Sequence, residues 1–433
     1  MNKQLFQAAP SWEILSADRL MVLCFAAFPL FALIWRGWIN ACLLISLLLS
    51  VYVLLRRGRK QAGVVSAEGT QLWVRIFSLA LAAPVAAVFL GQLFRREFVW
   101  SYYDSASKFL FAIPLLLVIL RRRINVIRLL EYAVPAAIFI TGLSILIHPN
   151  LHWGPDRLTT SFVDPLTFGS ICLTMALISL VSIDLQGQDP AWVRLYKLTA
   201  FVAGLYLSFL SGSRTGWLAL PIVLWLWLRF KRNVPNWMIF TAVALFCGAV
   251  YFSVPIVKLR IDIGIGELLH YQWDGVNRDT SVEMRLSFYR IGWYLFCQNP
   301  LGGWGDKGFK LLLSAPELRE FASDFAIGFT LNTGFHNEVI TNMVRSGVWG
   351  LISSLGLFLA PLALFVQGLR SPSVVVRSHA LPALGYLACV LVSGMSTEVF
   401  NLKYTASFHA MMLASFAGTL LMLMRSEHTP QNS

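Results

Sequence analysis

The sequence predicts an all-α polytopic membrane protein with about twelve transmembrane helices and one large helical loop. Of its 433 residues, 57% are hydrophobic and only 13% are charged, whereas roughly a quarter of a soluble chain is charged. The apolar residues gather in runs that approach the length of a spanning helix, and basic residues concentrate in alternate connections between the runs. Lipid is the solvent that suits such a composition.

The apolar runs define the expected helices and the division of the chain. Several are shorter than the ~20 residues that a perpendicular span needs, so we expect them to extend into their flanks. We divide the chain into nine spans at 1–253, a large loop with the start of the tenth span at 254–346, and the last three spans with a tail at 347–433. The runs cover 19–35, 38–55, 73–93, 106–120, 129–147, 165–184, 197–211, 216–229, 235–253, 347–368, 380–396 and 405–424.

Basic residues indicate the orientation of the spans. The connections on one side, with both tails and Arg75, hold 19 of the 35 Lys and Arg residues, and the short connections on the other side hold seven. Cytoplasmic connections are enriched in Lys and Arg, so both termini are predicted to be cytoplasmic and the large loop to lie across the membrane. The net charge of +13 then reflects topology, and no motif predicts a nucleic-acid partner. The polar residues 1–18 are interpreted as a cytoplasmic tail and not a signal peptide.

The large loop, at about 254–336, is predicted to be helical and nearly neutral. It carries eight Lys and Arg residues against nine Asp and Glu residues. Residues 282–297 have apolar side chains at helical spacing, which predicts an amphipathic helix. An Asn-Pro pair ends that helix, and four glycines within 302–308 predict a tight turn. A second amphipathic stretch covers about 309–322.

Three arginines predicted on the far side from the cytoplasm are candidate anion ligands. Arg157 lies before the sixth span, Arg214 follows the seventh, and Arg285 lies on the amphipathic loop helix. A guanidinium keeps its charge and binds phosphate through two parallel hydrogen bonds. Arg157 and Arg214 can equally reach lipid headgroups from a helix end. Arg285 can equally be a solvated or ion-paired side chain, so both interpretations stay open.

His336 is the candidate general base. It opens the helical run that leads into the span at 347, and we expect Asn332 or Thr333 to cap that run. The positive end of the helix dipole favours the neutral imidazole, which is the form that accepts a proton. The alternative is a histidine that only makes a hydrogen bond at the membrane interface.

Several motifs do not occur in the sequence, and this bears on cofactors and on transport. There is no Asp-x-Asp pair, phosphate-binding loop, Rossmann glycine pattern, His-Glu-x-x-His or Cys-x-x-Cys, and five of the six cysteines lie inside apolar runs. We therefore expect no metal, nucleotide or other cofactor. The spans hold almost no central Asp, Glu or Lys, which proton- and ion-coupled transporters usually need, so a transporter is disfavoured.

The order of four short motifs resembles the O-antigen ligase and polymerase superfamily of Gram-negative inner membranes. A Ser-Gly-Ser-Arg motif ends a span at 211–214, and the large loop carries Arg285 on a helix. An Asn-Pro-Leu-Gly-Gly-Trp-Gly segment follows at 299–305, and a His-Asn pair at 336–337 leads through Arg-Ser-Gly at 345–347 into the next span. The arrangement is most similar to O-antigen ligases of the WaaL type, which have about twelve spans and one large periplasmic loop before the tenth.

The resemblance implies a GT-C-like glycosyltransferase with its active site facing the periplasm. Such enzymes transfer a glycan from undecaprenyl diphosphate to a hydroxyl of lipid A–core oligosaccharide in lipopolysaccharide biosynthesis. The essential arginines and histidine of the family correspond by motif to Arg214, Arg285 and His336. Asn337 and the Gly-Gly-Trp-Gly turn depart from the family pattern, and the ligase, polymerase and protein O-glycosylating branches share most of these motifs.

The chemistry of this reaction agrees with the residues. Departure of a diphosphate builds negative charge that arginines in a partly dry site stabilise, and His336 can take the proton of the attacking hydroxyl. Direct displacement would invert the anomeric centre. Arg157 is predicted as a third diphosphate ligand, with Asn337 and Glu398 as supporting residues, although Glu398 can equally be an ordinary interfacial acid. The expected partners are the lipid-linked glycan, lipid A–core oligosaccharide and membrane lipids.

Three other functions stay open. An O-antigen polymerase would use the same donor with a lipid-linked acceptor. A protein O-oligosaccharyltransferase is disfavoured because the chain ends about nine residues after its last predicted span. A lipid or glycan transporter would need polar groups deep in the spans and access from both sides, and the sequence predicts neither.

Overall fold

The computed structural model describes residues 17–56, 68–150, 152–154, 157–184, 189–213, 215–253, 255–273 and 279–427. The helices of the first half are α1 Ala17–Ala27, α2 Trp38–Leu55, α3 Glu68–Arg95, η3 Trp100–Tyr102, α4 Tyr103–Arg122, α5 Val126–Ile147, α6 Pro165–Val181 and α7 Ala191–Leu210. Those of the second half are η4 Thr215–Leu218, α8 Ala219–Lys231, α9 Asn236–Ser253, α10 Pro255–Leu269, α11 Ser281–Gln298, α12 Gly305–Leu312, η5 Pro316–Glu320, α13 Asp324–Thr333, α14 Glu338–Leu369, α15 Val374–Gly394 and α16 Lys403–Glu427.

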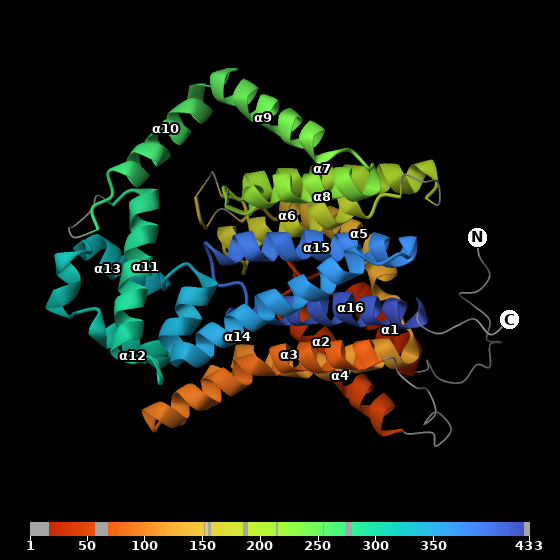
Figure 1. Cartoon of the computed structure of the whole chain (residues 1–433), viewed down its shortest axis with the longest axis horizontal. Helices are drawn as coiled ribbons and strands as arrows, with labels where there is room; N and C mark the ends of the chain where they lie inside the picture. The colour runs from red at the N-terminus through yellow and green to blue at the C-terminus, as the bar shows by residue number, and fades with distance from the viewer. Residues whose placement is uncertain are drawn as a thin grey trace.

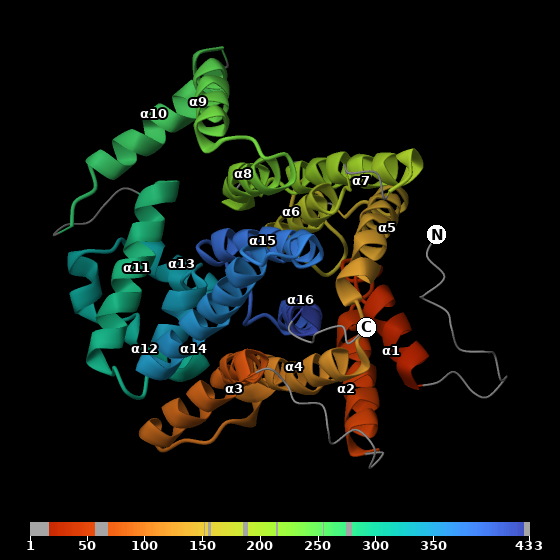
Figure 2. The same ribbon diagram turned by 45° about the vertical axis from the view of Figure 1, so that its right-hand side comes forward.

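Most of the long helices run side by side and form a bundle with two ends (Figure 1). We call the end at which α1 begins and α16 stops the tail end, and the end that carries α11, α12 and α13 the loop end. The last helix, α16, lies in the middle of the bundle, where it packs against α4, α14 and α15 (Figure 2). Nearly all of its side chains are buried, so it forms the core around which the other helices are arranged.

The predicted all-α polytopic membrane fold is confirmed. Within the described ranges, nine helices are long and apolar enough to cross a membrane: α2, α3, α4, α5, α7, α9, α14, α15 and α16. Three further predicted runs coincide with helices that are shorter, namely α1, α6 and α8. The expected total of about twelve spans therefore stays a prediction.

The tail end is where the basic connections meet. Arg122 at the end of α4 pairs with Asp18 at the start of α1, at 3.2 Å. Helices α5, α8 and α15 and the connections that follow α6 and α8 contribute residues to one pocket at this end. The clustering of arginines and lysines at one end agrees with the alternation in the sequence, and the assignment of that end to the cytoplasm stays a prediction.

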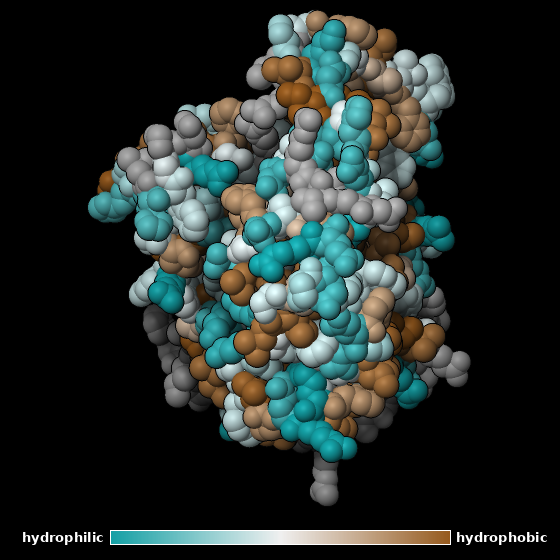
Figure 3. Space-filling view, turned by 90° about the vertical axis from the view of Figure 1, so that its left-hand side faces the viewer, coloured by the Kyte–Doolittle hydropathy of each residue, from teal (hydrophilic) through white to brown (hydrophobic). Residues whose placement is uncertain are grey.

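The loop end carries a small core of its own. Buried apolar side chains of α11 and α12 pack with Phe335 and with Val344 of α14. Helix α11 confirms the predicted amphipathic helix, because its Ile291 and Leu295 are fully buried. The second predicted stretch at 309–322 is wrong as one helix: α12 ends at Leu312, and Pro316 starts a separate 3-10 turn. Figure 3 looks onto the loop end, where hydrophilic residues cover much of the face.

Helices α9 and α10 stand away from the bundle in both views (Figures 1 and 2). Most side chains of α9 are apolar and exposed. A helix that is apolar all round is stable in lipid and not in water. We therefore expect α9 to contact lipid over most of its surface and to join the bundle to the loop end.

Candidate active site

His336 lies at the loop end, immediately before the first turn of α14. Asn337 is the N-cap of that helix, and its side-chain oxygen accepts hydrogen bonds from the backbone amides of Val339 and Ile340 at 3.0 and 3.1 Å. His336 adopts a positive φ of 47°. Non-glycine residues seldom occupy this region, and those that do concentrate at functional sites.

The predicted cap of this helix is wrong. Asn332 and Thr333 belong to the last turn of α13, where their side chains donate to backbone carbonyls four residues earlier. The cap is Asn337, so this expected supporting residue orders the start of α14. His336 therefore precedes the helix and does not lie in its first turn.

The imidazole of His336 packs beside two aromatic rings that stack on each other. It stacks near Phe288 of α11, with ring centroids 6.1 Å apart, and near Phe329 of α13, at 5.5 Å. One hydrogen bond joins the ring to the backbone of Ser396. The Nε2 atom is buried and has no partner among the described residues. An unpaired buried polar atom is costly, so this nitrogen is available to a substrate.

Burial lowers the pKa of His336 below its ordinary value, because a charged imidazole loses solvation there. The hydrogen bond to Ser396 and the carboxylate of Glu398 oppose that shift, whereas the guanidinium of Arg285 adds to it and Asp164 weakly opposes it. The predicted neutral form is thus favoured at pH 7, but the main cause is burial and not the helix dipole.

The structure brings two of the three carried-over residues together. Arg285 lies on α11, is half-buried, and acts electrostatically on the ring of His336. It makes no ion pair with any carboxylate in the described part of the chain. Arg214 lies outside the described residues. Arg157 lies in the connection between α5 and α6 with its side chain exposed, so its expected role as a diphosphate ligand stays a prediction.

Glu398 belongs to a chain of charges that sequence reasoning missed. Its Oε2 pairs with Nη1 of Arg345 at 3.1 Å, and its Oε1 accepts a hydrogen bond from Thr341 at 3.1 Å. Arg345 also pairs with Asp306 of α12 at 2.6 Å through its Nε. The guanidinium therefore ties α12 and the α15–α16 connection to α14, and it fixes the carboxylate that faces His336.

Arg345 is aimed by a kink in α14. Ser346 and Gly347 have non-helical backbone angles, with Gly347 at φ 62° and ψ −146°. A Cβ on Gly347 would lie 2.3 Å from the carbonyl oxygen of Pro300, and one on Gly303 would lie 2.6 Å from the backbone of Arg345. The two glycines let the turn after α11 pack directly against the kink, so the predicted tight turn has a specific partner.

Backbone hydrogen bonds and one arginine hold this turn in place. The amide of Val348 donates to the carbonyl of Pro300 at 2.7 Å, and the amide of Trp304 donates to that of Val344 at 2.8 Å. Arg95, at the end of α3, donates to the carbonyl of Gly302 and to that of Arg345, which directly precedes the kink. The orphan carbonyls at the kink are thereby satisfied, as buried backbone groups require.

Behind the kink lies a polar cavity of about 140 Å³ between α3, α4 and α14. Glu338 lines it and is fully buried. Its oxygens accept hydrogen bonds from the amide of Phe400 and from the side chains of Asn342 and Asn401, at 2.9, 2.6 and 2.8 Å. The start of α14 is therefore fixed to the α15–α16 connection by a satisfied polar network.

The arrangement supplies the parts of a group-transfer site. His336 offers a nitrogen that can accept a proton, and Arg285 offers a guanidinium without a described carboxylate partner. Glu398, paired with Arg345, supplies negative charge that acts on the ring of His336. These residues lie at the loop end of a membrane bundle. This position suits a substrate with a membrane-embedded tail and a polar head.

Residues 199–355 match a family model described as O-Antigen ligase. The matched segment contains Arg214, Arg285, His336 and Arg345, and it ends before Glu398. That family covers O-antigen ligases and polymerases, which are membrane enzymes of the glycosyltransferase kind, and the match does not distinguish the two reactions. The chain is also similar to a Haemophilus influenzae protein described as uncharacterized, with 23% identity over 311 residues, which cover 70% of this chain and 73% of that protein.

Proposed function

We propose that this protein is an O-antigen ligase, which transfers O-antigen polysaccharide from undecaprenyl diphosphate to a hydroxyl of lipid A–core oligosaccharide. The observation that supports it best is the unpartnered Nε2 of a neutral His336 beside Arg285 at the loop end. The match of residues 199–355 to the O-antigen ligase family adds to it. In this proposal the loop end faces the periplasm of a Gram-negative cell, and both termini are cytoplasmic.

The proposed step is a direct displacement. The acceptor hydroxyl attacks the anomeric carbon of the glycan while its proton moves to Nε2 of His336. The bond from that carbon to the diphosphate oxygen breaks, and its electron pair stays on undecaprenyl diphosphate. Attack on the face opposite the leaving group inverts the anomeric centre. The diphosphate already activates the sugar, so the proposed step is independent of metal.

Three arginines stabilise the leaving group in this proposal. Arg285 lies close enough to His336 to act on its charge, so a diphosphate beside Arg285 would lie near a hydroxyl that contacts His336. Arg214 is the second diphosphate ligand by motif, and Arg157 the third. Charge that develops in a partly dry site is stabilised far more strongly than in water.

Glu398 has a positioning role. Its carboxylate raises the proton affinity of His336 and is itself fixed by Arg345. When His336 takes a proton in the transition state, the nearby negative charge stabilises the imidazolium. Glu398 thus assists the base without contacting the sugar.

The experiment is glycan transfer by the purified full-length protein. The protein is mixed with undecaprenyl-diphosphate-linked glycan and rough lipopolysaccharide, with EDTA and without nucleotide, and products are separated by mass. His336→Ala is compared with His152→Ala, which removes an exposed histidine from the α5–α6 connection. Thermal unfolding of each variant checks that it is folded.

Each product has a distinct meaning. Glycan on lipopolysaccharide with wild type and His152→Ala, and none with folded His336→Ala, supports the ligase. Longer lipid-linked glycan in place of modified lipopolysaccharide would replace the ligase by the polymerase. Folded wild-type protein that forms neither product would contradict the enzyme and direct attention to transport.

A further inference from the structure

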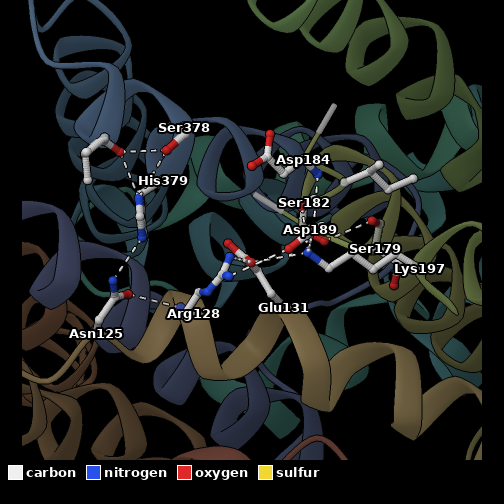
Figure 4. A network of polar contacts seen from close by, with 12 residues as sticks. Asn125, Arg128, Glu131, Ser179, Ser182, Asp184, Asp189, Lys197, Ser378 and His379 are labelled. Carbon is white, nitrogen blue, oxygen red and sulfur yellow. Dashed lines mark hydrogen bonds and ion pairs between the residues drawn. The ribbon is translucent and has the colours of Figure 1, made fainter. Parts of the chain in front are cut away.

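The tail end of the bundle contains a network of buried ion pairs that the proposed reaction does not use (Figure 4). Lys197 of α7 is fully buried, and its Nζ lies 2.7 Å from Asp189 and 3.3 Å from Glu131. Arg128 pairs with Glu131 at 2.7 Å and with Asp189 at 3.7 Å. Figure 4 shows the lysine and the arginine reaching these carboxylates from opposite sides.

This network neutralises Glu131 and Asp189 from within the protein. Three cations near them, Arg229, Lys231 and Arg377, form no direct ion pair in the described part of the chain. Among the described residues, Lys231 donates to the carbonyl of Ile183, and Arg377 donates to backbone carbonyls. Arg229 lies over the ring of Phe230 and forms no ion pair with a described carboxylate.

These cations line one pocket of about 380 Å³ between α5, α8 and α15. Its charged lining consists of Arg128, Arg229, Lys231 and Arg377 against Glu131 and Asp184. Four positive and two negative groups leave a surplus of two positive charges, and the pair of Lys197 and Asp189 behind the wall adds none. A pocket with this surplus favours an anion, and arginine and lysine bind phosphate well.

An apolar groove begins where this pocket ends. It has a volume of about 410 Å³ and is lined by α8, α14 and α15, and Phe230 lines both the pocket and the groove. Its lining runs from Ile222 to Phe230 on α8 and from Leu384 to Val392 on α15. At 1.5 Å per residue these stretches are about 12 Å long, which is close to half of the ~30 Å hydrocarbon core.

We propose that the pocket and the groove together bind one anionic phospholipid of the leaflet at the tail end. The headgroup phosphate lies against Arg229, Lys231 and Arg377, and an acyl chain lies in the groove between α8 and α14. The depth of the groove matches one leaflet, so a phospholipid fits it better than a polyprenyl chain that extends toward the other side. The surplus positive charge selects an anionic headgroup over a zwitterionic one.

Such a lipid would occupy the end of the bundle opposite His336. It would bridge α8, which leads into α9, and α14, whose other end carries the candidate active site. The inference does not depend on the proposed function, because it rests on the charges and shape of the tail end. Its test is a binding measurement and not an activity assay.

The test is native mass spectrometry of the purified full-length protein during titration with phosphatidylglycerol. Arg229→Gln with Arg377→Gln removes two pocket cations, and Arg232→Gln with Arg75→Gln removes two exposed cations that do not line the pocket. Each basic residue near an anionic lipid surface contributes a factor of about five in affinity. We therefore expect about thirtyfold weaker binding in the pocket variant and unchanged binding in the control.

A second variant tests the groove without changing charge. Ala388 lines the groove on α15, and the larger side chain of Ala388→Trp fills it. We expect at least tenfold weaker retention of phosphatidylglycerol, because the indole ring occupies the volume that the acyl chain would fill. Equal retention by wild type and both site variants, each shown to be folded, would overturn the proposal.

Competition identifies the source of the phosphate. Phosphatidylethanolamine and soluble glycerol 3-phosphate are expected to displace phosphatidylglycerol weakly. Displacement by glycerol 3-phosphate at equal concentration would show a soluble phosphate site and overturn the lipid. Stronger binding of undecaprenyl phosphate than of phosphatidylglycerol would overturn the phospholipid as occupant.

Discussion

Replacing Gly347 by alanine tests how the turn after α11 is held against the kink of α14. Gly347 has φ 62° and ψ −146°, a region that is essentially restricted to glycine and costs other residues about 1–3 kcal/mol. The new Cβ would also lie 2.3 Å from the oxygen of Pro300, so the turn must move. That movement breaks the hydrogen bonds from Val348 to Pro300 and from Trp304 to Val344, at about 1 kcal/mol each.

The sum is a loss of about 3–5 kcal/mol in the free energy of unfolding. Gly356 is the matched control on the same helix, because a Cβ there meets nothing within 4 Å. In a regular helix, glycine to alanine stabilises by about 0.5–1 kcal/mol. The midpoint of thermal unfolding in detergent, followed by tryptophan fluorescence, is expected to fall by at least about 3 °C for Gly347→Ala and to stay level or rise for Gly356→Ala.

Displacement of the turn also releases Asp306 from Arg345. The rate of glycan transfer by the folded Gly347→Ala protein is therefore expected to fall, in addition to any loss caused by unfolding. The comparison is made well below the unfolding midpoint of the variant. An unchanged midpoint together with wild-type transfer would refute the reasoning, because it would mean that the close contact between turn and kink carries neither stability nor the placement of Arg345.

Three further predictions concern single charges. Transfer is expected to decline as pH falls through the lowered pKa of His336, since only the neutral ring accepts a proton. Glu398→Gln is expected to shift that decline to lower pH, because it removes a charge that raises the pKa of His336. The pH–rate profiles of the wild type and the variant measure both effects. Arg345→Gln leaves the carboxylate of Glu398 without its cation, which is expected to destabilise by about 1.5–3 kcal/mol in denaturant unfolding, because the pair is only partly buried. Lys197→Met removes the buried cation from Asp189 and Glu131 and leaves them only the half-exposed Arg128, which is expected to cost about 3–5 kcal/mol in the same assay.

A control substitution at an exposed ion pair separates these specific effects from the general effect of removing a charged side chain. Arg319 forms an exposed pair with Asp324 at 2.9 Å, and Arg319→Gln is expected to cost at most about 1 kcal/mol. A profile for Glu398→Gln that moves to higher pH would contradict the assigned role of the carboxylate. Equal stability of Arg345→Gln and Arg319→Gln would contradict the structural role assigned to the ion pairs of Arg345.

The sequence alone predicted the membrane fold because lipid imposes a strong constraint on composition. Apolar runs became helices, and α11 appeared where Ile291 and Leu295 recur at helical spacing. The kink at Ser346 and Gly347 was missed because single glycines are common in membrane helices. A glycine two residues after Arg345, with a Gly-Gly-Trp-Gly turn upstream, is the signal that could have indicated it.

The candidate site was predicted in part. Arg285 and His336 were proposed from short motifs, but their approach depends on how α11 packs on α14, which sequence spacing does not determine. Arg345 was quoted only as part of a motif, and its two ion pairs required the fold. At the tail end, Arg229 and Arg377 were assigned to topology, and their meeting in one pocket arises from helices far apart in the chain.

The most direct measurement of the central claim is the transfer rate of His336→Gln with saturating donor and acceptor. Glutamine keeps a polar side chain at the site but cannot act as the base, so we expect the rate to fall by about 10²–10⁴ while donor binding and the unfolding midpoint stay unchanged. His152→Gln is expected to match wild type in all three readouts. A folded His336→Gln protein that transfers glycan within tenfold of the wild-type rate would contradict the account.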